Sequence, residues 1–403
     1  MDSFIDKILG DATTSGCFGD GATLLSNEKN LKKKSDDHFA SDISFQKLHF
    51  EKSGEKWSID VVIKVQPRSE RLREFARAKG QFRNEELMYK EVLPFLNRNG
   101  VIEKLFGTLY CAYVSTGEDD LNDYFVFEDL SSQGYRHSSS KTFLDFDHCA
   151  LAMKHIGMFH ALSYAKKHEG CGNELKILSK KFISKQSKER LSALSEFYYL
   201  CGKRGVDPVV REGISVEVLS EFLKNYDDLF KFYYSLVDAV EPEAVICHGD
   251  FCRNNIFFKY DEDGRPVSVK FYDLQTPAYT SPVIDLSFFL FMNTDQKLRD
   301  AHWDDLLLIY RNAVQDSIPG IEVPDLDFGR VAIYGYLLSS FFLPSMMQER
   351  QISDLEEQFD KPPHQVAVEA SKSGGDEATR VLANIIRHMA QRNYIRPSYY
   401  CNQ

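Results

Sequence analysis

Short apolar stretches separated by turn residues run through the first part of the chain, residues 1–130. Several of them alternate between apolar and polar positions or hold a brief apolar run, which favours strands. One longer stretch has apolar residues at helical spacing. The pattern therefore indicates a small sheet lobe with one helix. The predicted elements are strands at 43–51, 57–65, 105–115 and 124–128, a turn at 53–55, and a helix at 82–96 that Pro94 bends or ends.

Helical periodicity dominates residues 131–403. It is interrupted at 244–273, where the pattern indicates short strands around a turn at 261–264, and at 361–375, where prolines and glycines predict a loop. We therefore predict an α+β protein of two lobes. An N-terminal lobe at 1–130 and a C-terminal lobe at 131–403 would meet at a hinge near 127–131. The predicted helices are 147–164, 216–240, 298–316, 329–344 and 376–391.

Composition narrows the class of protein. The chain has 403 residues, of which 13% are aromatic, so there is material for a large core and disorder throughout is excluded. Its formal net charge of −11 argues against a protein that coats nucleic acid, because phosphate neutralisation needs Lys and Arg. The one dense basic run, Lys32-Lys33-Lys34, is expected to be a solvated loop.

The sequence also bears on location. No stretch approaches the ~18–20 uninterrupted apolar residues of a membrane span, and the nearest, 283–292, contains Asp285. Acidic residues stand near the N-terminus, where a signal peptide needs positive charge. The eight cysteines are scattered without a C-x-x-C pair, which favours reduced thiols over structural zinc. We expect a cytoplasmic protein without a membrane span.

The sharpest motif is the stretch 245–258, an apolar strand, then H-x-D-x-x-x-x-N, then a second apolar strand. It contains His248, Asp250 and Asn255, and a later strand ends at Asp273. This pattern is typical of a kinase catalytic loop and its metal-binding acid. The competing interpretation, that these residues only cap loops and turns, explains the H-G-D triplet alone but not the whole spacing.

Phosphoryl transfer explains why these residue types are needed. Clustered carboxylate and amide oxygens hold Mg²⁺ against the phosphates of ATP, and one carboxylate accepts the proton of the attacking hydroxyl. We predict Asp250 as that base, and Asn255 and Asp273 as metal ligands. Lys64 lies on the apolar strand 57–65 and fits the lysine that pairs with the α and β phosphates. The residues alone leave its acidic partner open between Glu85 and Glu86.

These motifs resemble the ecdysteroid kinase-like family of arthropods, within the choline kinase and aminoglycoside phosphotransferase group, whose fold is protein-kinase-like. The resemblance covers roughly residues 35–345 and selects Glu85 over Glu86. It also implies that Ser41 lies in the nucleotide loop and that Glu128, Asp129 and Leu130 form the hinge, where backbone groups bind adenine. The matching stretches are 36–42, Phe82-x-x-Glu85-x-x-x-Tyr89, 127–130, 159–163, 248–258, 272–275 and 284–286.

The resemblance assigns supporting roles as well. His248 is expected to fix the catalytic loop by hydrogen bonds, and Asp285 to brace that loop through its backbone. Two departures stand out. Ser35 occupies the position where the family usually has the first glycine of the nucleotide loop, and Arg253 lies inside the catalytic loop, where it either contacts a phosphate or is merely exposed.

The resemblance implies ATP- and Mg²⁺-dependent phosphorylation of a small-molecule hydroxyl, with an ecdysteroid or related sterol as the acceptor. Alternative acceptors are a xenobiotic or a choline-type amino-alcohol, and a pseudokinase that only binds a ligand is the non-enzyme alternative. Aromatic residues of the helical lobe either wall an apolar pocket or belong to the core, and core is the default. They include Phe197, Tyr198, Tyr199, Phe230, Phe232, Tyr233, Tyr234, Tyr334, Tyr336, Phe341 and Phe342.

Overall fold

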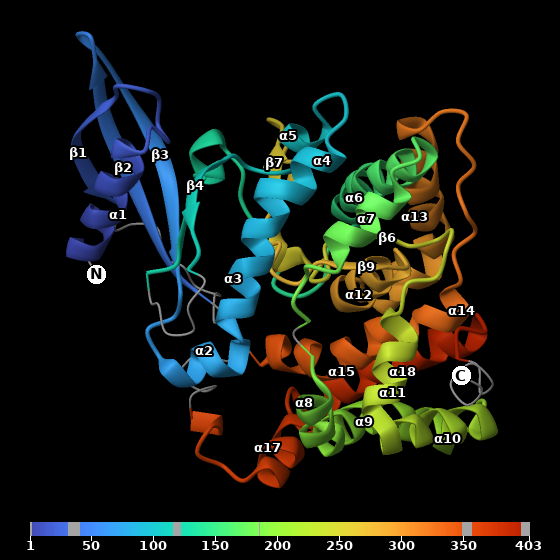
Figure 1. The fold of residues 1–403 in the computed structure, drawn as a ribbon. Helices are drawn as coiled ribbons and strands as arrows, with labels where there is room; N and C mark the ends of the chain where they lie inside the picture. The colour runs from blue at the N-terminus through green and yellow to red at the C-terminus, as the bar shows by residue number, and fades with distance from the viewer. Residues whose placement is uncertain (1, 31–40, 116–121, 185, 349–356, 396–403) are drawn as a thin grey trace.

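The computed structural model describes residues 2–30, 41–115, 122–184, 186–348 and 357–395. Figure 1 shows a sheet at one end of the molecule and a larger mass of helices at the other. The chain is thus an α+β protein with a kinase-like two-lobed arrangement, as the sequence predicts.

The N-terminal sheet has five antiparallel strands in the order β1-β2-β3-β5-β4. The predicted hairpin is confirmed. Lys52 pairs with Glu55 across a two-residue turn in which Ser53 and Gly54 have φ of 52° and 87°. Positive φ at both central residues matches the right-handed twist of the flanking strands. The strands are β1 (Thr23–Lys29), β2 (Asp42–Lys52), β3 (Glu55–Val65), β4 (Leu109–Tyr113) and β5 (Tyr124–Glu128).

Helix α1 (Asp2–Thr14) and strand β1 lie within the predicted lobe 1–130 but were not among its predicted elements, which began at residue 43 and included one helix. Ile5, Ile8 and Leu9 are at most 2% exposed and pack on the sheet core that contains Phe50 and Val61. Their spacing is helical, so the sequence carried the signal for α1. Strand β1 is a mostly exposed edge strand, and its sequence carried no signal that predicted a strand.

The predicted helix at 82–96 is longer and less regular than expected. It begins at Ala78 and includes α3 (Ala78–Leu87), a π-helical turn at Met88–Val92 and α4 (Leu93–Leu96). The wide turn precedes Pro94, whose ring nitrogen cannot donate the regular helical hydrogen bond. Before it lies α2 (Glu70–Ala76), and after it α5 (Val101–Leu105) occupies the start of the strand predicted at 105–115.

The second lobe is mostly helical, with two small sheets. Strand β6 (Val245–Cys247) pairs with β9 (Ala278–Thr280), and β7 (Ile256–Tyr260) pairs with β8 (Pro266–Phe271), which confirms the strands and turn predicted within 244–273. The helices are α6 (Phe146–His168), α7 (Gly172–Ser179), α8 (Lys188–Ala193), α9 (Ser195–Arg211), α10 (Val216–Lys224), α11 (Leu229–Val237), α12 (Val283–Asn293), α13 (Gln296–Ser317), α14 (Phe328–Val331), α15 (Ile333–Met347), α17 (Pro363–Ala370) and α18 (Gly375–Gln391).

Two predictions for this lobe are wrong. The helix predicted at 216–240 is two helices, because the chain turns at Asn225–Asp228 and the Asp228 carboxylate caps α11 by accepting from Lys231 N at 3.0 Å. The loop predicted at 361–375 contains α17. Its prolines begin that helix rather than prevent one, since a proline at the first helical position needs no N–H donor.

Helix α12 explains the most apolar stretch of the sequence. All of its residues are buried, and it packs against α15 so closely that a Cβ at Gly335 would lie 2.4 Å from the carbonyl carbon of Ser287. Within the described part of the chain, the structure has no helix whose length and apolar character would suffice to cross a membrane. The stretch 283–292 is therefore the centre of the helical lobe.

Residues 88–106 join the core of the helical lobe, while the sheet keeps a smaller core of its own. Met88, Val92 and Leu105 are fully buried there among residues of α6 and α12. The predicted lobe boundary at residues 130 and 131 stays a prediction, since this connecting segment packs with the helices.

A buried ionic cluster ties the beginning of α3 to the sheet. The Asp123 carboxylate is fully buried and accepts from Gln66 Nε2 at 2.6 Å, Ser115 N at 2.8 Å and Lys79 Nζ at 3.0 Å. We expect Asp123→Ala to lower the free energy of unfolding by about 2–4 kcal/mol, because Gln66 Nε2 and Ser115 N lose this acceptor and the Lys79 ammonium loses its carboxylate partner, keeping Ser115 Oγ. Urea unfolding measures this.

The control for that measurement is Asp263→Ala, which alters an exposed acid in the 261–264 turn. It should change the free energy of unfolding by no more than about 0.5 kcal/mol. Equal unfolding midpoints for the two variants would contradict a structural role for the Asp123 cluster.

Candidate active site

Lys64, Glu85 and Asp273 meet between the two lobes. Lys64 lies on β3, Glu85 on α3 and Asp273 just after β8. The Lys64 ammonium is 2.7 Å from Glu85 Oε2 and 2.7 Å from Asp273 Oδ1. Glu86 instead pairs with Lys90 on the helix surface. The structure therefore places Glu85, and not Glu86, beside Lys64.

Charge and burial act against each other in this trio. Burial alone would lower the pKa of Lys64, but the charges of Asp273 and Glu85 and the hydrogen bonds to them outweigh it, so the net pKa is raised. Burial raises the pKa of Glu85, and the negative charge of Asp273 adds to this while Lys64 opposes it. Lys64 is therefore a fixed cation that holds two carboxylates together.

Asp250 and Asn255 form the second half of the site. The Asn255 amide donates to the Asp250 backbone oxygen at 2.8 Å and to Asp250 Oδ2 at 3.0 Å. Between His248 and Asp250, Gly249 has a φ of 82°, and a Cβ there would lie 1.7 Å from Thr276 O. Only glycine fits this turn.

The β7–β8 hairpin brings Asn255 and Asp273 to adjacent strand ends. Ile256 pairs with Phe271, and Tyr272 N donates to Asn255 O at 3.2 Å. Asp273 itself has a φ of 67°, a left-handed conformation that is uncommon for residues other than glycine and that clusters at functional sites.

His248 connects the catalytic loop to the residue before Asp273. Its Nε2 lies 2.9 Å from Tyr272 O, which can only accept, so Nε2 carries the proton. Nδ1 then accepts from Asp250 N at 3.4 Å. The loop-fixing role that the resemblance implies would use these two contacts, and it stays a prediction.

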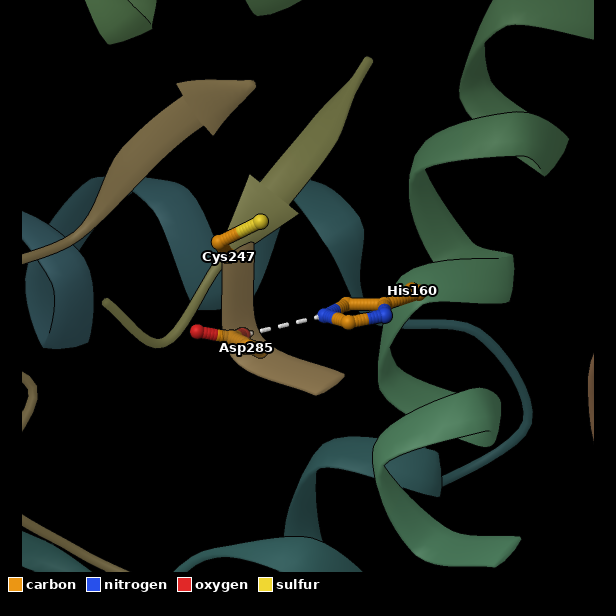
Figure 2. Close-up of side chains that lie close together, drawn as sticks. All are labelled: His160, Cys247 and Asp285. Atoms are coloured by element: carbon orange, nitrogen blue, oxygen red, sulfur yellow. Dashed lines mark hydrogen bonds and ion pairs between the residues drawn. The ribbon is translucent and has the colours of Figure 1, made fainter. Parts of the chain in front are cut away.

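Asp285, at the start of α12, accepts from two consecutive backbone N–H groups of the loop. His248 N lies 2.7 Å from its Oδ2 and Gly249 N lies 2.8 Å from its Oδ1. His160 on α6 reaches Asp285 Oδ2 at 3.1 Å, as Figure 2 shows, and its other ring nitrogen bonds Tyr310 OH at 3.0 Å. The sequence gave no signal for Tyr310.

Cys247 lies beside this pair, so that His160, Cys247 and Asp285 bring three possible metal-ligand atoms within 4.8 Å of one another (Figure 2). The geometry does not favour a metal. Burial, and then the charge of Asp285, raises the pKa of Cys247 well above its usual value, which keeps the thiol protonated. That thiol lies 3.5 Å from Ser281 O, and the Asp285 oxygens already accept backbone donors. The cluster is a brace for the loop.

The hinge residues are held in place by their own contacts. Glu128 N donates to Thr108 O at 2.9 Å, and Asp129 N donates to Asp60 O at 3.0 Å. The Asp129 side chain caps a short 3₁₀ helix (Leu130–Gln133) by accepting from Ser131 N at 3.0 Å. Leu130 is the first residue of that helix, and the first N–H groups of a helix have no partner inside it.

The predicted nucleotide loop falls mainly outside the described residues, which exclude 31–40 and therefore Ser35 and the stretch 36–40. Ser41 is described and is 4% exposed. It directly precedes β2, in which Asp42 pairs with Val65, the neighbour of Lys64. The register thus brings Ser41 close to the end of β3 that carries the lysine.

Arg253 is not merely exposed, which was one of the two alternatives for this residue. It is half-buried, its backbone N donates to Asn293 Oδ1 at 3.0 Å, and its guanidinium donates to Ser140 O. These contacts tie the catalytic loop to α12 and to the segment that follows the hinge. Contact with a phosphate stays a prediction.

The aromatic residues of the helical lobe divide between core and surface. Tyr198, Phe232, Tyr334 and Tyr336 are buried, in agreement with the core default. The other aromatic residues of that set are half-buried and pack against this core: Phe197, Tyr199, Phe230, Tyr233, Tyr234, Phe341 and Phe342.

The ecdysteroid kinase-like family model matches residues 35–321, which is more than half of the chain. The match spans strand β3 with Lys64, residues 127–131, the loop 248–255 and Asp285. A search of curated proteins found no match.

Proposed function

Because the chain belongs to the ecdysteroid kinase-like family, we propose that it transfers the γ-phosphoryl group of ATP to a hydroxyl group of a small molecule, with Mg²⁺. The observation that carries the proposal is the meeting of Lys64, Glu85 and Asp273 beside the Asp250–Asn255 pair. A set of turn caps would not bring a buried lysine and two carboxylates together at an interlobe site.

The oxygen donors fit Mg²⁺, which prefers carboxylate and amide oxygens. Asp273 and Asn255 are the proposed ligands. The Asn255 amide nitrogen already donates to Asp250, which turns the amide oxygen, the atom that binds metal, to the other side of the group. Bound Mg²⁺ would neutralise charge on the phosphates, and Lys64 would pair with the α and β phosphates.

Asp250 is the proposed base. Its carboxylate accepts the proton of the acceptor hydroxyl as the oxygen–phosphorus bond forms, and ADP leaves with the electron pair of the bond that breaks. The Asn255 amide and the His248 ring hold the loop, so that the carboxylate does not need to reorganise during the reaction. At the hinge, the Leu130 N–H and the Glu128 carbonyl are the proposed adenine contacts.

The acceptor proposed first is an ecdysteroid or related sterol. Phe341 and Phe342 are half-buried, and Phe342 lies 6.3 Å from Phe288 of α12, the helix that also carries Asp285. This arrangement supports an apolar acceptor close to the catalytic loop. A xenobiotic fits the same surface, and a choline-type amino-alcohol is the runner-up. A cytoplasmic location fits the proposal, because ATP and reduced thiols belong to that compartment.

One assay tests the proposed function. The pure protein is incubated with ATP, Mg²⁺ and a panel of ecdysteroids, sterols, xenobiotic alcohols and amino-alcohols, and products are detected as a mass increase of one phosphoryl group. We expect phosphorylation of at least one apolar alcohol. ATP binding without any phosphorylated product would favour the pseudokinase alternative, for which the substitution at Ser35 is the main argument.

Lys64 and Glu85 should act as a unit. Lys64→Ala is expected to weaken ATP binding or slow transfer, because the ammonium offsets phosphate charge, and Glu85→Ala should share part of that loss by releasing the lysine. In a double-mutant cycle on kcat/KM for ATP, we expect a coupling of about 1–3 kcal/mol. Strict additivity would show that their 2.7 Å contact has no part in catalysis.

A further inference from the structure

Asn84 lies one residue before Glu85 on α3 and is 2% exposed. Its carboxamide makes three hydrogen bonds, all to backbone groups of the helical lobe. Oδ1 accepts from Ile183 N at 2.7 Å, and Nδ2 donates to Ile183 O at 2.9 Å and to Gln275 O at 3.0 Å. One side chain thus holds a peptide group from each of two segments that are far apart in sequence.

The first of these segments connects α7 to α8, and Figure 1 shows it passing beside α3 on its way to α8. It meets one face of the helix, because Gly80 and Asn84 lie four residues apart, and it also meets Arg77, which precedes the helix. Arg77 Nη2 lies 3.2 Å from Ser187 Oγ. A Cβ on Gly80 would lie 3.0 Å from Ile183 Cγ2. A larger side chain at residue 80 would therefore press on Ile183, which makes two of the contacts with Asn84.

The second segment follows the proposed metal ligand. Gln275 is two residues after Asp273 and is 4% exposed. Through Gln275 O, Asn84 ties the helix that carries Glu85 to the loop that carries Asp273. Glu85 and Asp273 both contact the Lys64 ammonium, so the connection joins the two acids that share one lysine.

Electrostatics explains why the connection between α3 and the Asp273 loop matters. Two carboxylates that share one buried cation repel each other, and both Glu85 and Asp273 lie 2.7 Å from the Lys64 ammonium. A movement of α3 away from the helical lobe would take Glu85 from Lys64, and Asn84 adds a link that opposes it, beside the Lys79–Asp123 pair that ties the helix to the sheet. A neutral amide bonded to backbone groups resists this motion at every pH at which the protein is folded, because neither partner titrates.

We propose that Asn84 is a positioning residue, which fixes α3 against the helical lobe so that Glu85 and Asp273 meet Lys64 together. For its activity readout, the inference rests on the proposed kinase function. It assigns no contact with ATP or acceptor to Asn84, so it predicts an effect on the geometry of the Lys64 trio and none on the affinity for the acceptor.

The test compares Asn84→Ala with a matched control on the same helix, Glu86→Ala, which removes only a surface pair with Lys90. We expect Asn84→Ala to lower kcat, or kcat/KM for ATP, by about 10- to 100-fold, the effect of a small misplacement of reacting groups. KM for the acceptor should be unchanged. Hydrogen exchange should become faster at 84–92 and 183–190. Glu86→Ala should match the wild type in all these measurements.

A purely structural role gives a different result. In that case Asn84→Ala would lower the melting temperature, while well below it kcat and the exchange of α3 would match the wild type, and the inference would be overturned. Asn84→Asp keeps the acceptor for Ile183 N but turns a charged oxygen toward two carbonyl oxygens. Its kcat should therefore fall at least as far as that of Asn84→Ala.

A steric pair tests the same contact without changing Asn84. Gly80→Val should press on Ile183, separate the segment from α3 and lower kcat, and adding Ile183→Ala should restore part of the activity. These two variants also test the contact between the segment and α3 if Asn84→Ala does not fold. Wild-type kcat in Gly80→Val, or no recovery in the double variant, would count against the docking of this segment as the cause.

Failure of the inference and failure of the proposed function can be told apart. If the wild type phosphorylates an acceptor and Asn84→Ala does so equally well, only the positioning role falls. If the wild type phosphorylates nothing, the kinase proposal falls, and faster exchange at 84–92 in Asn84→Ala but not in Glu86→Ala still supports the link between α3 and the Asp273 loop. Unchanged exchange would reject that link as well.

Discussion

Asp273→Asn is expected to lower the rate of phosphoryl transfer by about 10³-fold or more, while the chain stays folded. The substitution keeps the size of the side chain but removes the charge of the proposed main Mg²⁺ ligand, next to the phosphates where that charge matters most. Lys64 keeps Glu85 at 2.7 Å, so its buried ammonium is not left without an anion. The measurement is turnover across a range of Mg²⁺ concentrations, together with circular dichroism to verify folding.

Asp263→Asn is the matched control, because it makes the same chemical change in an exposed turn. It should keep wild-type turnover. If Asp273→Asn also kept near wild-type turnover with Mg²⁺, the assignment of Asp273 as metal ligand would be wrong. Partial recovery at high Mg²⁺ would instead support it, since a weakened metal site fills at higher metal concentration.

Asp250→Asn should lower the rate by about 10²- to 10⁴-fold, the range for a lost general base, with little effect on binding. An asparagine at residue 250 keeps an oxygen that can accept from Asn255 Nδ2, now 3.0 Å from Asp250 Oδ2. The backbone bond from the same amide to residue 250 is also unaffected. The loop should therefore keep its shape while the proton acceptor is lost.

A turnover assay and an ATP and acceptor titration on two proteins test this second prediction. The proposed kinase should show a large loss of kcat with near-equal affinities. A pseudokinase would show no turnover in the wild type, and the substitution would not change its affinities for ATP and acceptor. Equal phosphorylation by both proteins would remove Asp250 from the mechanism, and with it the main reason to interpret 248–255 as a catalytic loop.

The pattern of apolar, polar and turn residues predicted the structure correctly wherever a segment forms its element from its own residues. The hairpin of β2 and β3, the β7–β8 hairpin and α6 followed from alternation, turn residues and helical spacing. The failure at α17 has a local cause too, since Pro362 and Pro363 are equally compatible with a loop and with a helix start. Only packing against α9 and α15 decides between the two.

The amino-acid sequence already identifies the chemical groups: a lysine on an apolar strand, an H-x-D-x-x-x-x-N loop and an acid at the end of a later strand. Resemblance then selected Glu85 over Glu86. The tertiary structure alone decided which groups touch. Lys64 and Asp273 are 209 residues apart in the chain, and Asn84 reaches residues 99 and 191 positions away. Such contacts depend on how helices and strands pack, and no periodicity within one segment records that packing.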